Sequence, residues 1–322
     1  MGLTSQVVLS AALFTLVGSP VAAQQARAQP VADEHADHAM HAAPARSTTP
    51  RSSAKRTTAK PNTVRRAQQQ AIPAGSTTAK ERIEKSPRHQ EYVKIATGVA
   101  PGDSIAAWVV YPQVRGKAPV VVVIHEIFGL TMWIRSVADQ LAADGFIAIA
   151  PDLMTGKISP ATPDSAPQLA TQVIRTLNPA TVQAQLKAVG EYGLSLPAAK
   201  KGKYGVVGFC WGGSTSFAHA VANPDLGAAV VYYGSSPAVA DLAKVKAPVL
   251  GLYGELDARV NVSIAPADSA LKALGGKFDW QMYAGAGHGF LRGQDGMNGA
   301  NLEATKLAWP RTLAFFRGTI GK

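Results

Sequence analysis

The chain of 322 residues contains a single cysteine, Cys210, so no disulfide can form within one chain. It also lacks an apolar run long enough to cross a bilayer comfortably, because its candidate stretch, residues 7–17, is shorter than the ~20 residues that a spanning helix needs. No internal repeat is apparent. An unpaired thiol is a liability in an oxidising compartment unless it is shielded or has a chemical task, which favours a purpose for Cys210.

The first 23 residues have the layout of a secretory signal peptide. The apolar stretch 7–17 is followed by Val21-Ala22-Ala23, a small-x-small cleavage pattern. The usual basic start is missing, since no Lys or Arg precedes Arg27. An apolar helix or a membrane anchor is the alternative interpretation. We predict a signal peptide over residues 1–23 and a periplasmic or secreted protein.

Large apolar side chains are almost absent from the next segment, which is rich in Ala, Thr, Ser, Pro and Gln. Such a composition buries too little surface to offset the entropy of ordering, so we predict a disordered basic linker over residues 24–90. Between Arg27 and Lys94 there are 13 Lys and Arg against 6 Asp and Glu, most of the net charge of +11. We therefore expect at most a weak contact of this tail with anionic surfaces, and no nucleic-acid partner for the rest.

Three histidines of this segment, His35, His38 and His41, recur at every third residue beside acidic side chains. Imidazoles and carboxylates at such spacing can bind Cu, Ni or Zn. We favour the alternative that these histidines are simply solvated, because the sequence shows no further groups that would orient the imidazoles for metal binding. We predict no metal and no cofactor.

Residues 91–322 have the alternating pattern of one α/β domain. The pattern predicts strands at 92–95, 105–111, 119–124, 146–150, 204–209, 228–233, 249–253 and 279–283, and helices at 134–144, 181–194, 213–222, 263–274 and 301–316. Residues 153–180 are loop-rich and suit a lid. We expect a mostly parallel, doubly wound sheet flanked by helices, with an active site beyond the carboxyl ends of the strands.

The run Y-G-V-V-G-F-C-W-G-G at residues 204–213 is typical of a nucleophile elbow with cysteine in place of serine. Gly208 and Gly212 lie two places on either side of Cys210 and permit a sharp strand-to-helix turn. The turn would raise the sulfur above the sheet and direct backbone N–H groups toward whatever it attacks. An ordinary buried cysteine in a glycine-rich turn is the alternative.

Three polar residues follow other predicted strands at the same edge: Glu126 after residue 124, Asp257 after residue 253 and His288 after residue 283. An imidazole near Cys210 would take its proton, and Asp257 would fix the tautomer of that imidazole. Singly, Asp257 suits a turn cap, and Glu126 or His288 a solvated loop residue. The joint order of nucleophile, acid and histidine favours catalysis.

Taken together, these motifs make the domain resemble the dienelactone hydrolase (carboxymethylenebutenolidase-like) family of the α/β-hydrolase superfamily. The resemblance is carried by H-E-I-F-G at 125–129, P-D-L at 151–153, G-F-C-W-G-G at 208–213, Y-Y-G at 232–234, G-E-L-D at 254–257 and A-G-H-G-F at 286–290. It extends from about residue 91 to residue 318, and it implies an α/β-hydrolase fold.

The resemblance also implies a Cys210–Asp257–His288 triad. Glu126 would contact the resting thiol and assist its deprotonation when substrate enters. Attack of the sulfur on an ester or lactone carbonyl would give an acyl-thioester that water then cleaves.

For the rest of the site, the resemblance implies an oxyanion hole formed by the backbone N–H groups of Ile127 and Trp211. Arg292 matches a family arginine that binds the substrate carboxylate. A second family arginine, expected shortly after P-D-L, has no counterpart in Met154-Thr155-Gly156.

We therefore predict an exported, monomeric hydrolase that cleaves a lactone or small carboxylic ester. Two alternatives stay open: a non-catalytic surface or binding protein on the same scaffold, and a thioesterase or peptidase with the same triad.

Overall fold

The computed structural model describes residues 72–322. The predicted signal peptide, most of the predicted linker and the three tail histidines His35, His38 and His41 lie outside the described residues. The chain divides into two units, residues 1–57 and 58–322, and the described residues all belong to the second.

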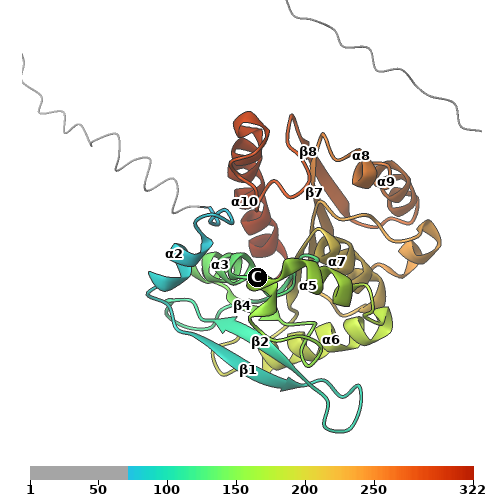
Figure 1. Ribbon diagram of the computed structural model, residues 1–322. Helices are drawn as coiled ribbons and strands as arrows, with labels where there is room; N and C mark the ends of the chain where they lie inside the picture. The colour runs from blue at the N-terminus through green and yellow to red at the C-terminus, as the bar shows by residue number, and fades with distance from the viewer. Residues whose placement is uncertain (1–71) are drawn as a thin grey trace, which may run out of the picture. The chain divides into compact units, whose positions relative to one another are not determined.

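Eight strands form one sheet in the order β1-β2-β4-β3-β5-β6-β7-β8 (Figure 1). The strands are β1 (Gln90–Ala96), β2 (Ser104–Val110), β3 (Val120–Ile124), β4 (Ile147–Pro151), β5 (Gly205–Phe209), β6 (Ala228–Tyr232), β7 (Val249–Gly254) and β8 (Phe278–Tyr283). The β1–β2 and β2–β4 pairs are antiparallel. Every pair from β4–β3 to β7–β8 is parallel, which confirms the predicted mostly parallel sheet.

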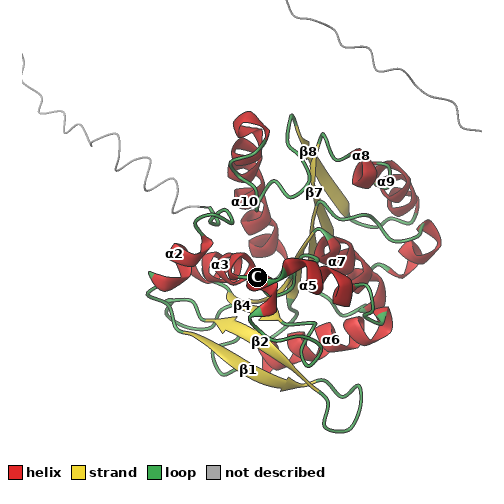
Figure 2. Ribbon diagram, viewed as in Figure 1, coloured by secondary structure: helices red, strands yellow, loops and turns green. Residues whose placement is uncertain are grey.

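Helices cover both faces of this sheet (Figure 2). They are α2 (Ala79–Glu84), α3 (Met132–Ala143), α4 (Thr162–Ser165), α5 (Pro167–Ile174), α6 (Pro179–Ser195), α7 (Trp211–Ala222), α8 (Ala258–Asn261), α9 (Ile264–Ala273) and α10 (Ala300–Thr319), with 3₁₀ turns η1 (Val239–Lys244) and η2 (Met297–Gly299). On one face α3 and α10 bury their apolar side chains, and on the other α6, α7 and α9 bury theirs. The sheet is therefore doubly wound.

The central strands supply both cores, because successive side chains of a strand point to opposite faces. In β3, Val121 and Val123 pack with α3 and α10, whereas Val120 and Val122 pack with α6 and α7. All residues of β3 are buried, and each such side chain contributes roughly 1.5–3 kcal/mol. The carboxyl ends of these strands are consequently rigid places from which to hold a site.

Residues 153–180 contain two short helices rather than only loop. Pro163 and Pro167 lie in the first turns of α4 and α5. Backbone N–H groups in a first turn make no hydrogen bond within the helix, so a proline there costs none. Met154, Ala170 and Ile174 form a small buried cluster beneath this segment. Pro163 and Pro167 thus lie at helix starts within a segment that was predicted to be loop-rich.

Packing against the domain begins at Ile72, well before the predicted boundary at residue 91. Ile72 and Ala79 are buried, and α2 lies against α3. Arg82 and Arg88 pair with the buried carboxylate of Asp139 on α3. The composition of the segment indicated a linker because it has few apolar residues, but ion pairs to Asp139 add to the contacts of those few.

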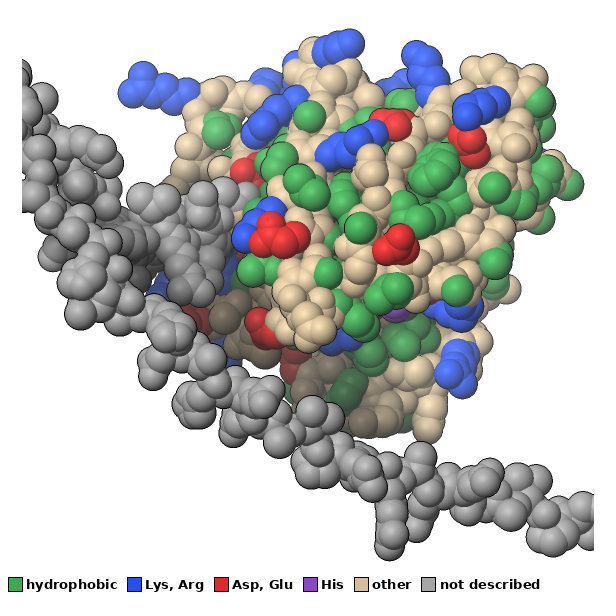
Figure 3. All heavy atoms as spheres, turned by 90° about the horizontal axis from the view of Figure 1, so that it is seen from above, with side chains coloured by type: hydrophobic (Ala, Val, Ile, Leu, Met, Phe, Trp, Pro, Cys, Tyr) green, Lys and Arg blue, Asp and Glu red, His purple; other side chains and the backbone are tan. Residues whose placement is uncertain are grey.

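On the face seen in Figure 3, Lys and Arg side chains are scattered among apolar and neutral groups with Asp and Glu between them. Within residues 72–322, none of the helices is both long and apolar enough to cross a membrane.

Candidate active site

The turn after β5 has the geometry of a nucleophile elbow. Cys210 has φ 57° and ψ −117°, a conformation rare for a residue with a side chain. A Cβ on Gly208 would lie 1.8 Å from the Gly212 carbonyl oxygen, and one on Gly212 would lie 2.4 Å from the Ile124 carbonyl oxygen. Only glycine fits at both places. The Cys210 N–H donates to the Tyr232 carbonyl (3.1 Å), which holds the strained residue on the sheet.

The groups around the Cys210 sulfur shift the pKa of the thiol in opposite directions. Burial raises the pKa of the thiol, and the neighbouring Glu126 carboxylate raises it further. The backbone N–H groups of Trp211 and Ile127 donate to the sulfur and, with the nearby Arg259 guanidinium, act in the opposite direction. The net pKa lies above the ordinary value, so the resting group is a neutral thiol whose sulfur already contacts two N–H donors.

Asp257 and His288 form a close pair at the ends of β7 and β8. His288 Nδ1 lies 2.5 Å from Asp257 Oδ2, and the Asp257 side chain is only 5% exposed whereas that of His288 is 33% exposed. The two loops are tied together, since the Leu256 N–H donates to the Ala286 carbonyl (3.0 Å). An imidazole held at Nδ1 by a buried carboxylate presents Nε2 for proton transfer.

Glu126 is buried beside the sulfur and is paired with Arg292. The distance from Arg292 Nε to Glu126 Oε2 is 2.8 Å, and the Glu126 side chain is 4% exposed. Burial raises the pKa of this carboxyl to about 7, against the opposite effect of Arg292. Glu126 thus changes charge near neutral pH, next to the thiol.

The loop that carries Glu126 is fixed by the neighbouring H-E and P-D-L motifs. His125 Nδ1 donates to the Glu126 carbonyl (2.7 Å), and His125 Nε2 accepts from the Leu153 N–H (3.3 Å). Burial lowers the pKa of His125, so the ring is neutral and can make both bonds. Asp152 accepts from the Met154 N–H (3.1 Å) and closes the adjoining turn.

Sequence reasoning missed Tyr233, which lies between the two halves of the site. Its backbone has φ 40°, its side chain is fully buried, and its hydroxyl has no hydrogen-bond partner. The ring meets that of His288 edge-on with centroids 5.2 Å apart. Burial raises the pKa of the phenol, and the neighbouring Glu126 carboxylate raises it further. The Y-Y-G motif, directly after a buried strand, was the available signal.

The structure therefore brings the predicted residues together in two groups that meet at Tyr233. Cys210, Glu126 and Arg292 adjoin the N–H groups of Ile127 and Trp211, and His288 pairs with Asp257. Arg292, predicted to bind substrate, is engaged with Glu126 in this structure.

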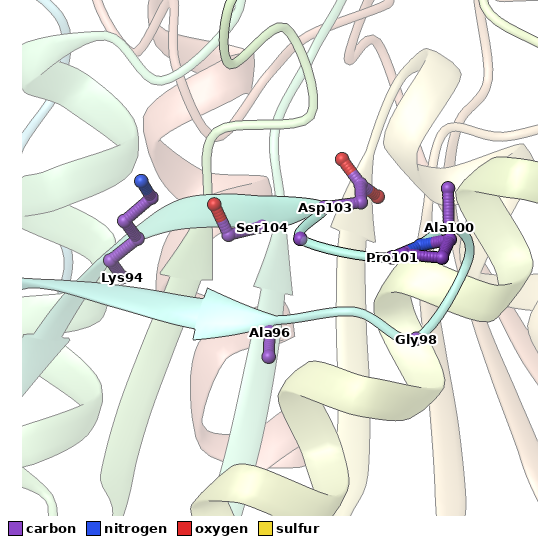
Figure 4. A pocket seen from close by; sticks show the side chains of 8 residues that line it. Lys94, Ala96, Gly98, Ala100, Pro101, Asp103 and Ser104 are labelled. Carbon is purple, nitrogen blue, oxygen red and sulfur yellow. The ribbon is translucent and has the colours of Figure 1, made fainter.

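A separate hollow lies on the β1–β2 hairpin, where Lys94, Pro101 and Asp103 are among its lining residues (Figure 4). The strands β4 and β3 separate this hairpin from β5 in the sheet. Across residues 72–322, no group of three or more His, Cys, Asp or Glu side chains is arranged to hold a metal ion.

This strand order, the elbow and the acid and histidine at the next strand ends define an α/β-hydrolase fold. A profile of the dienelactone hydrolase family matches residues 105–320, and the chain belongs to this family. It resembles a Salmonella typhimurium protein provisionally named carboxymethylenebutenolidase, with 34% identity over 69% of this chain and 85% of the relative. An Escherichia coli O157:H7 protein of the same provisional name is 33% identical over 69% of this chain and 85% of its own length.

Among solved structures, a provisionally assigned dienelactone hydrolase of Klebsiella pneumoniae is 30% identical, with a TM-score of 0.61 over 71% of this chain and 98% of that one. A dienelactone hydrolase-like promiscuous phosphotriesterase from metagenomic libraries shares the fold at 22% identity, with a TM-score of 0.57 over 72% of this chain and 98% of that one. The family match and the relatives at 30% identity or more support a hydrolase that acts on ester bonds.

Proposed function

We propose that this protein hydrolyses a lactone or small carboxylic ester through a Cys210–His288–Asp257 triad. The observation that carries the proposal is the elbow, whose sulfur contacts the N–H groups of Ile127 and Trp211 at the same strand-end edge as the His288–Asp257 pair. These are the nucleophile, the oxyanion donors and the oriented base that acyl transfer requires.

In the first half-reaction the Cys210 thiol loses its proton and Sγ forms a bond to the substrate carbonyl carbon. Glu126 assists this deprotonation, and His288 is the base that carries the proton onward. The carbonyl oxygen becomes an oxyanion held by the two N–H groups, each of which typically contributes ~100-fold or more in rate. Collapse breaks the carbon–oxygen ester bond, and the leaving alkoxide takes the proton from His288.

In the second half-reaction a water molecule gives a proton to His288 and attacks the thioester carbon. Collapse of this intermediate breaks the carbon–sulfur bond, releases the acid and returns the proton to Cys210. No cofactor is needed in either half-reaction.

The surroundings of the sulfur support a substrate that is partly apolar and partly anionic. Ile127 and Trp211 pack with the buried cluster of Met154, Ala170 and Ile174 and form an apolar wall. Arg292 and Arg259 are the cations whose charges act on Glu126 and Cys210 respectively. We propose that Arg292 binds a substrate carboxylate when it leaves Glu126.

We further propose that the protein is exported, on the strength of the signal-peptide pattern in residues 1–23. Cell fractionation with N-terminal sequencing of the mature chain tests the export. A cytoplasmic chain that keeps Met1 would contradict it.

The triad is tested with Cys210→Ala, which removes the sulfur from a position where a methyl group fits. We expect p-nitrophenyl acetate turnover to fall to background while the melting temperature stays close to that of the parent. Mass spectrometry of the parent during turnover is expected to show a transient acyl adduct on Cys210. Undiminished turnover by the variant would refute the assignment.

A further inference from the structure

The segment 72–88, here called the strap, lies against the loop that carries two residues of the site. This loop, residues 284–296 between β8 and η2, is called the catalytic loop and contains His288 and Arg292. The Ser76 N–H donates to the Arg292 carbonyl (2.9 Å), and Gln294 Nε2 donates to the Pro73 carbonyl (2.9 Å). The strap therefore contacts the backbone of Arg292 itself.

The approach of the two segments at this point is close. A Cβ on Gly75 would lie 3.4 Å from the Arg292 carbonyl oxygen and 3.6 Å from the Gln294 side chain, the ordinary distances of van der Waals contact, so the strap packs directly against the loop here. The Thr77 hydroxyl donates to Asp295 (3.2 Å) at the next step along the loop. On the loop's own side, the Arg292 N–H donates to the Gly289 carbonyl (3.0 Å). The peptide groups on both sides of Arg292 are thus held.

Both ends of the strap are fixed to α3, at Ala74 near its start and at Arg82 and Arg88 near its end. The Asp139 carboxylate, fully buried, lies 2.8 and 2.5 Å from the Arg88 guanidinium and 3.5 Å from that of Arg82. Trp133 Nε1 donates to the Ala74 carbonyl (3.0 Å). A buried and bidentate arginine–carboxylate pair has a defined geometry, unlike an exposed pair.

We propose that the strap is a positioning element of the active site, which holds the Arg292 backbone so that the guanidinium stays on Glu126. The path of contacts runs from Asp139 through the strap to the Arg292 carbonyl, and from the Arg292 side chain to Glu126 beside the sulfur. Arg292, Cys210 and Tyr233 are the titratable or charged groups that face Glu126, from the catalytic loop, the elbow and the end of β6. The inference rests on the proposed role of Glu126 in thiol activation.

A loosened strap has a specific electrostatic consequence. Burial raises the pKa of Glu126, and within residues 72–322 Arg292 is the group that lowers it. When the guanidinium is less well held, the carboxyl stays protonated to a higher pH. Complete loss of an opposite charge at this distance shifts a pKa by about 1–3 units, so partial loosening predicts an upward shift of about half a unit or more.

The test is Ser76→Pro in the full chain, with Ser76→Ala as its matched control. Residues 75–78 form a turn closed by the Thr78 N–H and the Gly75 carbonyl (3.1 Å), and proline suits the second position of such a turn. The proline therefore removes the N–H that binds the Arg292 carbonyl and preserves the turn. The alanine keeps that N–H and removes only an exposed hydroxyl.

Because the chain has one cysteine, the rate of Cys210 alkylation by iodoacetamide reports on the site without any turnover. The rate is measured from pH 5 to 9, and Glu126→Gln identifies the inflection that belongs to Glu126. Ser76→Pro is expected to move this inflection upward by about half a unit or more, whereas Ser76→Ala should superimpose on the parent. In p-nitrophenyl acetate hydrolysis, the same shift lowers kcat/KM about threefold at pH 6 and leaves it unchanged well above the inflection.

Gln294→Met, which removes the donor to the Pro73 carbonyl, provides a second route if Ser76→Pro does not fold, and melting curves identify folded samples. The proposal is overturned if folded Ser76→Pro, or Gln294→Met in its place, keeps the parent's inflection, even with a lower overall rate. Absence of ester turnover in the parent would instead refute the proposed function, and the alkylation profile would still decide the role of the strap.

Discussion

At the scale of single residues, Glu126 is a carboxyl group whose pKa is shifted in opposite directions by burial and by Arg292. The folded pKa of this carboxyl, about 7, lies above its ordinary value of 4.5 because burial outweighs Arg292. The native state therefore binds the proton more tightly than the unfolded chain does. A group of this kind lowers the stability of the fold as it ionises, and it provides a base that is ready near neutral pH.

Glu126→Gln is expected to separate these two effects. Since the folded pKa is raised, the parent loses stability as pH rises from about 5 to about 8, on the order of 3 kcal/mol. Glu126→Gln has no carboxyl group to ionise and so lacks this loss. Its free energy of unfolding should therefore increase relative to that of the parent as the pH rises through this range. Its kcat/KM should fall about 100-fold.

Urea unfolding at pH 5 and pH 8, with ester hydrolysis at both, measures the two effects. Equal pH dependence of stability in parent and variant would show that the carboxyl is not held at a raised pKa.

The site residues that sequence predicts are those tied to a local pattern. Cys210 lies between its glycines, and Asp257 and His288 each follow a strand, so chain order alone places them at one edge. Tyr233 was missed because its importance depends on a positive φ and on the ring of His288, from another loop. The Arg292–Glu126 pair joins residues 166 positions apart, and no local pattern encodes such a contact.

At the scale of elements, the elbow depends on the approach of backbone to backbone. Gly208→Ala would place a Cβ 1.8 Å from the Gly212 carbonyl oxygen and 2.3 Å from its carbon. Backbone atoms within a helix start cannot give way as a flexible side chain can. We expect a loss of at least about 3 kcal/mol in unfolding free energy, together with loss of ester hydrolysis.

Gly318→Ala in α10 is the matched control for this substitution. A Cβ there meets no atom within 4 Å, and alanine favours a helix by up to about 1 kcal/mol over glycine. Denaturant unfolding of both variants makes the comparison. Equal stabilities for Gly208→Ala and the parent would show that the elbow can relax.

Strands and helices were predicted correctly where the apolar pattern of their own residues is long and continuous. The buried strands β3, β5 and β7 were found within a residue or so at each end, because a continuous apolar run bounded by turn residues is a strong signal. The short helices α2, α4 and α8 were not predicted, because a helix of four to six residues has fewer than two turns and cannot repeat its apolar pattern. Tertiary contacts stabilise such pieces, and the sequence pattern does not show these contacts.

At the scale of the whole molecule, the folded domain begins at Ile72, and ion pairs anchor a first segment that has few apolar residues. The composition of residues 24–90 indicated a linker throughout, yet Arg82 and Arg88 from this segment pair with Asp139. The Asp139 side chain is fully buried, and a charge in that position needs its partners. Residues 72–90 are consequently connected to the rest of the domain by buried side chains and by ion pairs.

Two shortened chains test this boundary. A chain of residues 72–322 retains the strap and all the residues of the site, so we expect it to keep the kcat and the melting behaviour of the full chain. A chain of residues 91–322 loses both arginines, so the Asp139 carboxylate keeps no cation, and it loses the buried side chains of Ile72 and Ala79 as well. We therefore expect this chain to unfold at a lower urea concentration than the full chain.

Asp139→Asn in the 91–322 chain shows whether charge is the cause. The substitution removes the unpaired charge and keeps the shape of the side chain. In the 91–322 chain it should therefore recover part of the lost stability. In the full chain it should lower the free energy of unfolding, because Arg82 and Arg88 lose their partner. This opposite sign in the two backgrounds is the expected signature of a coupled pair. If Asp139→Asn changed stability equally in both chains, the segment would be held by its apolar contacts at Ile72 and Ala79 instead.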